Sequence, residues 1–210
     1  MNNSRWTRVA PLTGIGFVVL AAAGVLVINN YDYLPPAEEV KAFFEANAAS
    51  VTVGAYLIFF SSFLLLWFAG SLRSALRTAE GGTGRLSAVA FAGGIAAAVG
   101  VMVAMSATLT ISTRAGAEGG IPADAAMMLQ DFSGYLMAGV LAGGLGVMIA
   151  ATAVVAYRTG FLPRRSAWVS AIIAIGSLSP IAYIVGGAAV LWVGVIGYVL
   201  YTRQTQAAAS

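Results

Sequence analysis

Four hydroxyl side chains in the apolar part of this sequence are the first candidates for chemistry: Thr108, Ser177, Ser179 and Tyr183. Charged residues fall outside the expected membrane spans, so a ligand at membrane depth would meet hydroxyls, and these four are our candidates among them. One interpretation is a small cavity for a neutral or lipid-like solute. The other is that each hydroxyl bonds to a carbonyl of its own or a neighbouring helix, the commoner role of such side chains.

Acidic side chains provide a fifth candidate. Asp131 is the acid nearest to an apolar stretch, four residues before Tyr135, and we treat it as a candidate ligand-binding residue. The other acids gather mainly in the segments 29–50 and 112–134. Carboxylates suit hard divalent cations, but these segments lack the alternating spacing of a calcium loop. We therefore expect a solvated acidic surface and no metal.

The absence of two residue types excludes several kinds of site. The sequence has no His and no Cys. Without them there is no zinc site of the common kind, no thiolate nucleophile and no His-ligated haem. No serine lies in a nucleophile-elbow sequence either. We therefore expect no catalytic residues and no cofactor, and we expect that the protein is not an enzyme.

The composition points to a membrane. Of the 210 residues, 60% are hydrophobic and 9% are charged, whereas soluble domains carry about 25% charged residues. A helix needs about 20 apolar residues to cross a ~30 Å hydrocarbon core. The sequence predicts an all-α polytopic integral membrane protein with one domain, residues 1–210. Its six expected spans lie at about 9–28, 51–72, 86–111, 135–157, 167–182 and 186–202.

The last two expected spans come from dividing one uncharged tract, residues 167–202. As a single helix this tract would be about 54 Å long, too long for one crossing. Pro180 and the pair Gly186-Gly187 favour a turn between residues 178 and 187. Pro180 marks either this hairpin turn or a helix broken around a ligand site.

Charge predicts the orientation of the spans. The two termini and the loops at 73–85 and 158–165 carry nine basic residues and one acid, whereas the segments 29–50 and 112–134 carry two basic residues and seven acids. Because short basic loops stay in the cytoplasm, we expect three hairpins in the plasma (inner) membrane with both termini cytoplasmic. The sequence has no basic face with interleaved aromatic residues, so we expect no binding of nucleic acid. Five arginines are expected to meet lipid headgroups: Arg73, Arg77, Arg85, Arg164 and Arg165.

Both acidic segments contain a helix-start pattern. Proline is followed closely by acids at 35–39 and again at 122–124, and this order is typical of a first helical turn. We therefore expect a short outer helix at about 36–48 and another at about 122–132.

Two surfaces are suited to packing against a second chain. Gly139 and Gly143 form a GxxxG pair, and small residues let helices approach closely in lipid. Packing within one chain and contact with a partner subunit or a second copy both fit this pair. The bulky run from Phe59 to Phe68 gives the second expected span an aromatic face that meets lipid or a partner.

Two short segments carry a resemblance. Residues 72–81, LRSALRTAEG, follow the second expected span, and residues 160–165, GFLPRR, precede the fifth. With the overall layout, they resemble a diffuse group of uncharacterised six-helix membrane proteins common in high-GC actinobacteria. This resemblance implies no activity. From the residues we expect a non-catalytic membrane component, either an accessory subunit or a small oligomer. The alternative is a binding or permeation protein for a small neutral or lipid-like solute.

Overall fold

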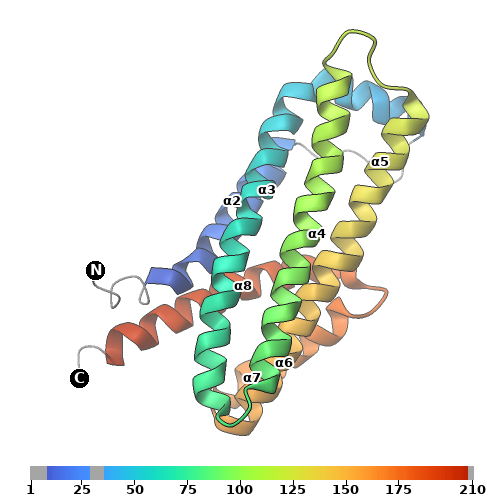
Figure 1. The fold of residues 1–210 in the computed structure, drawn as a ribbon. Coiled ribbons are helices and arrows are strands. Elements are labelled where there is room, and N and C mark those ends of the chain that lie inside the picture. The colour runs from blue at the N-terminus through green and yellow to red at the C-terminus, as the bar shows by residue number, and fades with distance from the viewer. Residues whose placement is uncertain (1–8, 29–35, 208–210) are drawn as a thin grey trace.

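The computed structural model describes residues 9–28 and 36–207 of the chain, which form helices joined by short turns (Figure 1). In chain order the elements are η1 (Ala10–Leu12), α2 (Thr13–Ile28), α3 (Ala37–Glu80), α4 (Arg85–Ala115), α5 (Ala123–Tyr135), η2 (Leu136–Leu141), α6 (Ala142–Thr159), α7 (Arg164–Ser177) and α8 (Ala182–Ala207). The element η1 is a 3-10 turn, and η2 is a π-helical stretch. The predicted all-α class is therefore confirmed for the described part of the chain.

Five helices in the described ranges are long and apolar enough to cross a membrane. They are Ala10–Ile28, Ala37–Glu80, Arg85–Ala115, Ala123–Thr159 and Ala182–Gln206. The fifth expected span, at 167–182, is not among them. The uncharged tract divides at 178–181, inside the expected turn region, but α7 has only 14 residues. It is about 21 Å long, which is shorter than a ~30 Å hydrocarbon core.

Helix α3 bends at Asn47, whose φ of −121° and ψ of 17° are not helical. The Asn47 side-chain amide donates a 2.9 Å hydrogen bond to the carbonyl oxygen of Phe43. The side chains of Asn and Ser compete in this way with regular helical hydrogen bonds. The bend turns the first part of α3 away from the long membrane-spanning part.

Residues 37–46 of α3 form an arm that lies across one end of the bundle (Figure 1). A short helix was expected here at 36–48. Val40 and Phe44 of the arm are each 1% exposed, and they belong to one apolar cluster with Ile111 and Ile121. The arm is therefore amphipathic and covers the loop between α4 and α5.

The other outer helix does not end at the expected residue. The segment expected at 122–132 continues through η2 into α6, and the three elements form one rod of 37 residues, Ala123–Thr159. The π-helical stretch lies within the span expected at 135–157. A π turn holds an extra residue, so side chains after η2 face about 100° away from their α-helical positions.

The contacts between helices follow a ring in the order α2, α3, α4, α6, α7 and α8, and α8 returns to α2. The main core lies inside this ring and includes Phe68 of α3 and Leu145 of α6. Helices α4 and α6 approach most closely at Gly93 and Gly144. A Cβ on either glycine would lie within 2.7 Å of backbone atoms of the other helix, so both positions require glycine.

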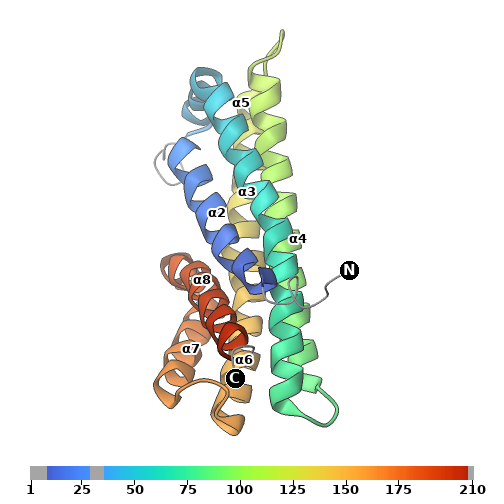
Figure 2. The same cartoon turned by 90° about the vertical axis from the view of Figure 1, so that its left-hand side faces the viewer.

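The α3–α4 hairpin extends beyond the start of α2 and the end of α8 (Figures 1 and 2). Its turn contains Gly81, Gly82 and Gly84, all with positive φ, a conformation that glycine adopts without steric cost. Residues 48–80 of α3 would span about 50 Å, and α4 about 46 Å. Both lengths exceed the ~30 Å core. Because the hairpin extends beyond α2 and α8, the flank of α3 stays uncovered beside the ends of these two helices.

Candidate functional site

The structure gives Thr108 a partner on α5. Its hydroxyl oxygen lies 3.1 Å from that of Ser133, and Ser133 donates a 3.0 Å hydrogen bond to the carbonyl oxygen of Ala104. Thr108 and Ser133 are both buried. These bonds join α4 to α5, and they are interhelical bonds of the kind that membrane helices use for packing.

The three candidates near the α7–α8 turn have different surroundings. Ser179 donates to the carbonyl oxygen of Gly176 at 2.8 Å, which closes the turn. Tyr183 is 73% exposed. Ser177 is 2% exposed, and its hydroxyl has no hydrogen-bond partner among the described residues. The hydrogen bonds of the described residues therefore do not join these three side chains to Thr108.

Asp131 lies on α5 and is half-buried. Among the described residues, the one ion pair is that between Lys41 and Glu45, with 3.9 Å between Nζ and Oε1. The same residues contain no group of three or more acidic, His or Cys side chains that could hold a metal ion. Within the described ranges Asp131 thus forms no ion pair and belongs to no group of three that could hold a metal ion.

A groove of about 830 Å³ lies between α3, the start of α2 and the end of α8. Most of its walls are apolar. They are formed by Val9, Ala10, Thr13, Leu64, Leu66, Trp67, Gly70, Ser71, Ser74, Phe91 and Gln204. Trp67 is 65% exposed, so one wall of the groove is an open aromatic surface.

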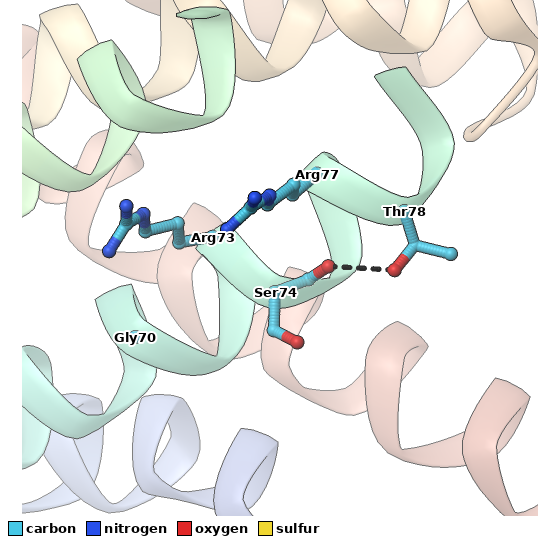
Figure 3. A pocket seen from close by; sticks show the side chains of 5 residues that line it. All are labelled: Gly70, Arg73, Ser74, Arg77 and Thr78. Atoms are coloured by element: carbon cyan, nitrogen blue, oxygen red, sulfur yellow. Dashed lines mark hydrogen bonds between the residues drawn. The ribbon is translucent and has the colours of Figure 1, made fainter. Parts of the chain in front are cut away.

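The groove adjoins a second, cationic hollow of about 480 Å³ on the same helix (Figure 3). This hollow is lined by Gly70, Arg73, Ser74, Arg77 and Thr78, and it shares Gly70 and Ser74 with the apolar groove. Figure 3 shows Arg73 and Arg77 following one another along one side of α3, as side chains four residues apart do on a helix. Thr78 donates a 3.1 Å hydrogen bond to the carbonyl oxygen of Ser74.

Both arginines are positioned by the α3–α4 hairpin. The guanidinium carbon of Arg73 lies 5.1 Å from the ring centroid of Phe91 on α4, which is a cation–π contact. The aliphatic part of Arg77 packs beside the turn, since a Cβ on Gly84 would lie 3.2 Å from its Cγ. The hairpin therefore holds two cations next to the apolar groove.

Glu80 forms no ion pair with either arginine in the described structure. Its two carboxylate oxygens instead accept 2.9 Å hydrogen bonds from the backbone N–H groups of Leu86 and Ser87. These bonds, that from Leu86 above all, hold the pKa of Glu80 below its ordinary value. Glu80 thus caps the first turn of α4, and the charges of Arg73 and Arg77 are not neutralised by it.

The other arginines expected at lipid headgroups lie elsewhere. Arg85 is exposed at the start of α4, and Arg164 and Arg165 are exposed at the start of α7. None of the three lines the groove or the hollow. A separate groove of about 530 Å³ lies between α6 and α7, and it contains Arg158 and Trp168.

Sequence reasoning placed Arg73 and Arg77 at lipid headgroups but missed the apolar groove beside them. One feature of the sequence could have indicated the groove: Trp67 precedes Arg73 and Arg77 on the same expected helix. The opposite walls, Val9 and Gln204, come from distant parts of the chain. Comparison with protein-family models, curated proteins and solved structures found no match to this chain.

Proposed function

We propose that this protein is a non-catalytic integral membrane component that assembles with another membrane chain, as an accessory subunit or a small oligomer. The observation that best supports this function is the surroundings of Gly139 and Gly143. A Cβ on either would meet no atom within 4 Å, whereas a Cβ on Gly144 would overlap α4. The GxxxG pair is therefore unused by packing among the described residues, and it allows a second helix to approach closely.

An aromatic stripe on α3 supports the same function. Tyr56, Phe60, Phe63 and Trp67 follow at helical spacing, and their exposed fractions lie between 42% and 65%. Tyr56 and Phe60 stack with ring centroids 6.1 Å apart. A stripe of neighbouring rings offers a large, rigid apolar surface to a partner helix.

The test is the stoichiometry of the protein in membranes, measured by single-molecule photobleaching in lipid nanodiscs. We expect G139L/G143L to shift the population to single chains. The matched variant G186L/G187L changes two other open glycines, on α8, and should leave the stoichiometry unchanged. If the unmodified protein is strictly monomeric and copurifies with no other chain, the proposed function is wrong.

For the topology, we propose that the basic ends of the helices face the cytoplasm of the plasma membrane. Helix α7 begins with Arg164 and Arg165, and Arg203 near the end of α8 donates to the carbonyl oxygen of Phe161 and lies 5.3 Å from its ring centroid. These contacts support a hairpin that starts and ends at one membrane face. A re-entrant α7–α8 hairpin keeps both termini cytoplasmic, even though α7 is too short to cross.

The absence of cysteine from the sequence makes this topology simple to test. A single cysteine at Gly119 is expected to react with an impermeant maleimide added from outside. A single cysteine at Gly82 is expected to react only after the membrane is permeabilised. S179C at the α7–α8 turn should stay unlabelled from outside. Rapid external labelling of S179C would show that the hairpin crosses the membrane.

A second candidate function is the binding of a lipid-like solute. The surface beside α3 favours it, because the apolar groove and the hollow with two arginines adjoin each other there.

A further inference from the structure

We propose that the groove beside α3 binds one anionic phospholipid, with its phosphate between Arg73 and Arg77 and an acyl chain along Leu64 and Trp67. The proposal deepens the second candidate function by assigning its ligand and its site. It does not need assembly through the GxxxG pair, which is not part of the groove. Trp67 belongs both to the groove and to the aromatic stripe, so the two proposals are tested by separate measurements.

Charge identifies the phosphate as the ligand group. Arg73 and Arg77 lie one helical turn apart, where like charges repel. No carboxylate among the described residues forms an ion pair with either of them, and Glu80 is occupied by N–H groups of α4. Guanidinium groups bind phosphate oxygens through paired, charge-assisted hydrogen bonds. A phosphate between them would replace a repulsion with two favourable contacts.

The apolar walls identify the rest of the ligand. The groove volume of about 830 Å³ lies in the range of small-molecule sites, about 300–1,000 Å³. Trp67 is 65% exposed and Val9 is 51% exposed, so a chain can enter sideways from the surrounding lipid. A free phosphate would use the arginines and leave this surface uncovered. A phospholipid uses both parts of the site.

Gln204 adds a polar contact inside the groove. Its Oε1 atom is buried and has no hydrogen-bond partner among the described residues, and the side chain lines the groove. A buried acceptor without a donor is unfavourable. A hydroxyl of the lipid headgroup would supply that donor. We therefore assign a headgroup of the phosphatidylglycerol type, which carries both a negative phosphate and hydroxyls.

The depth of the site suits a lipid. Trp67 lies near the end of the apolar part of α3, where aromatic side chains meet the membrane interface. Arg73 follows six residues later, about 9 Å along the helix axis. A ligand with its chain beside Trp67 and its phosphate beside Arg73 is therefore aligned with the lipids around the protein.

The test is native mass spectrometry of the purified full chain, after incubation with mixed micelles that contain phosphatidylglycerol or phosphatidylcholine. We expect one retained phosphatidylglycerol, and retention at least about tenfold weaker in R73Q/R77Q, because both charge-assisted contacts to the phosphate are lost. The control R164Q/R165Q removes the same charge from an exposed pair outside the groove and should retain the lipid. Circular dichroism and thermal melting confirm that each variant is folded.

Three outcomes would overturn the proposal. Equal loss in R164Q/R165Q would mean general electrostatic attraction. Equal retention of phosphatidylcholine, unaffected by R73Q/R77Q, would mean ordinary boundary lipid. Displacement of the lipid by inorganic phosphate alone at millimolar concentration would mean an anion site without a chain-binding groove.

A second measurement locates the acyl chain. Phosphatidylglycerol brominated on its chains should quench tryptophan fluorescence in a saturable step, and W67F should lose that step. W168F changes another exposed tryptophan, in the groove between α6 and α7, and should keep it. A saturable step that survives in W67F would contradict the proposed site. It would not bear on the assembly proposal, because the number of chains is measured separately by photobleaching.

Discussion

The hydroxyl oxygens of Thr108 and Ser133 lie 3.1 Å apart, and this pair ties α4 to the long rod formed by α5, η2 and α6. The Ser133 hydroxyl also reaches the carbonyl oxygen of Ala104, at 3.0 Å. Lipid supplies little hydrophobic drive between helices, so such bonds and close packing hold membrane helices together. The pair satisfies two polar side chains that would otherwise be candidates for ligand binding.

We expect T108V and S133A each to lower the free energy of unfolding by about 0.6–1.7 kcal/mol, the range of hydrogen bonds between membrane helices. The double variant should cost less than the sum of the two, because both changes remove the same contact. Unfolding in mixed micelles measures these values. T110V is the control, since Thr110 is exposed and bonds only within α4 at the carbonyl oxygen of Ser106. Additive effects would show that the two hydroxyls act independently.

Two neighbouring glycines, Gly143 and Gly144, should respond differently to substitution by alanine. G144A places a methyl group 2.5 Å from the backbone nitrogen of Ala97, and we expect a loss of about 1–3 kcal/mol of stability from overpacking. G143A meets no atom within 4 Å and should leave the stability of the single chain unchanged. Thermal melting in detergent compares the two variants. A destabilised G143A monomer would place Gly143 in intrachain packing and remove the support for assembly.

Ser177 and Ser170 on α7 form a second matched pair. Ser170 accepts a 2.8 Å hydrogen bond from the indole nitrogen of Trp192, so S170A leaves that buried N–H unpaired, at a cost of about 1–3 kcal/mol. S177A removes a buried hydroxyl that has no partner among the described residues, and it should be neutral or stabilising. Chemical unfolding decides between them. If S177A costs as much as S170A, the Ser177 hydroxyl has a favourable contact that the described residues do not supply, as the cavity hypothesis requires.

The hairpin between α3 and α4 should lose stability in acid. Its Glu80 has a folded-state pKa below the ordinary value of 4.5, so the stabilisation is complete above that value and disappears as the pH falls through the lowered pKa. We expect E80Q to melt below the unmodified protein at neutral pH, with the difference closing as the pH falls below 4.5 and through the lowered pKa of Glu80. E118Q, in the exposed loop after α4, should melt normally. A constant difference at every pH would exclude the titration of Glu80 as its cause.

Apolar length was enough to predict most of the helices, because a chain in lipid must satisfy its backbone hydrogen bonds internally. It did not predict the length of α7. The tract around Pro180 is apolar on both sides, so hydropathy does not show where the helix ends. The extra residue of η2 was also invisible, since π-helical bonding has no distinctive composition in Leu136–Leu141.

Only the part of the candidate site that lies on one helix, the two arginines of α3, could be predicted from the sequence. Helical spacing shows that Arg73 and Arg77 share a face, and their position after an apolar span places them near headgroups. The apolar half depends on η1 and α2 crossing α8, where a Cβ on Gly197 would lie 2.7 Å from the carbonyl oxygen of Pro11 in η1. The sequence shows that residue 197 is a glycine, but it does not show which other helix packs against that position.

The bend at Asn47 separates the arm from the main core, and we expect the two parts to differ in stability. Buried residues of the arm form an apolar cluster with others at that end of the bundle, and none of its buried members belongs to the main core: Val40, Phe44, Val51, Ile111, Ile121 and Ala126. A small cluster opens at lower free energy than a large one, and it does so as one cooperative unit. Amide protons of residues 37–46 should therefore exchange with solvent while those of α4 and α6 remain protected. The end of the bundle that carries the arm can then rearrange without melting the helices inside the membrane.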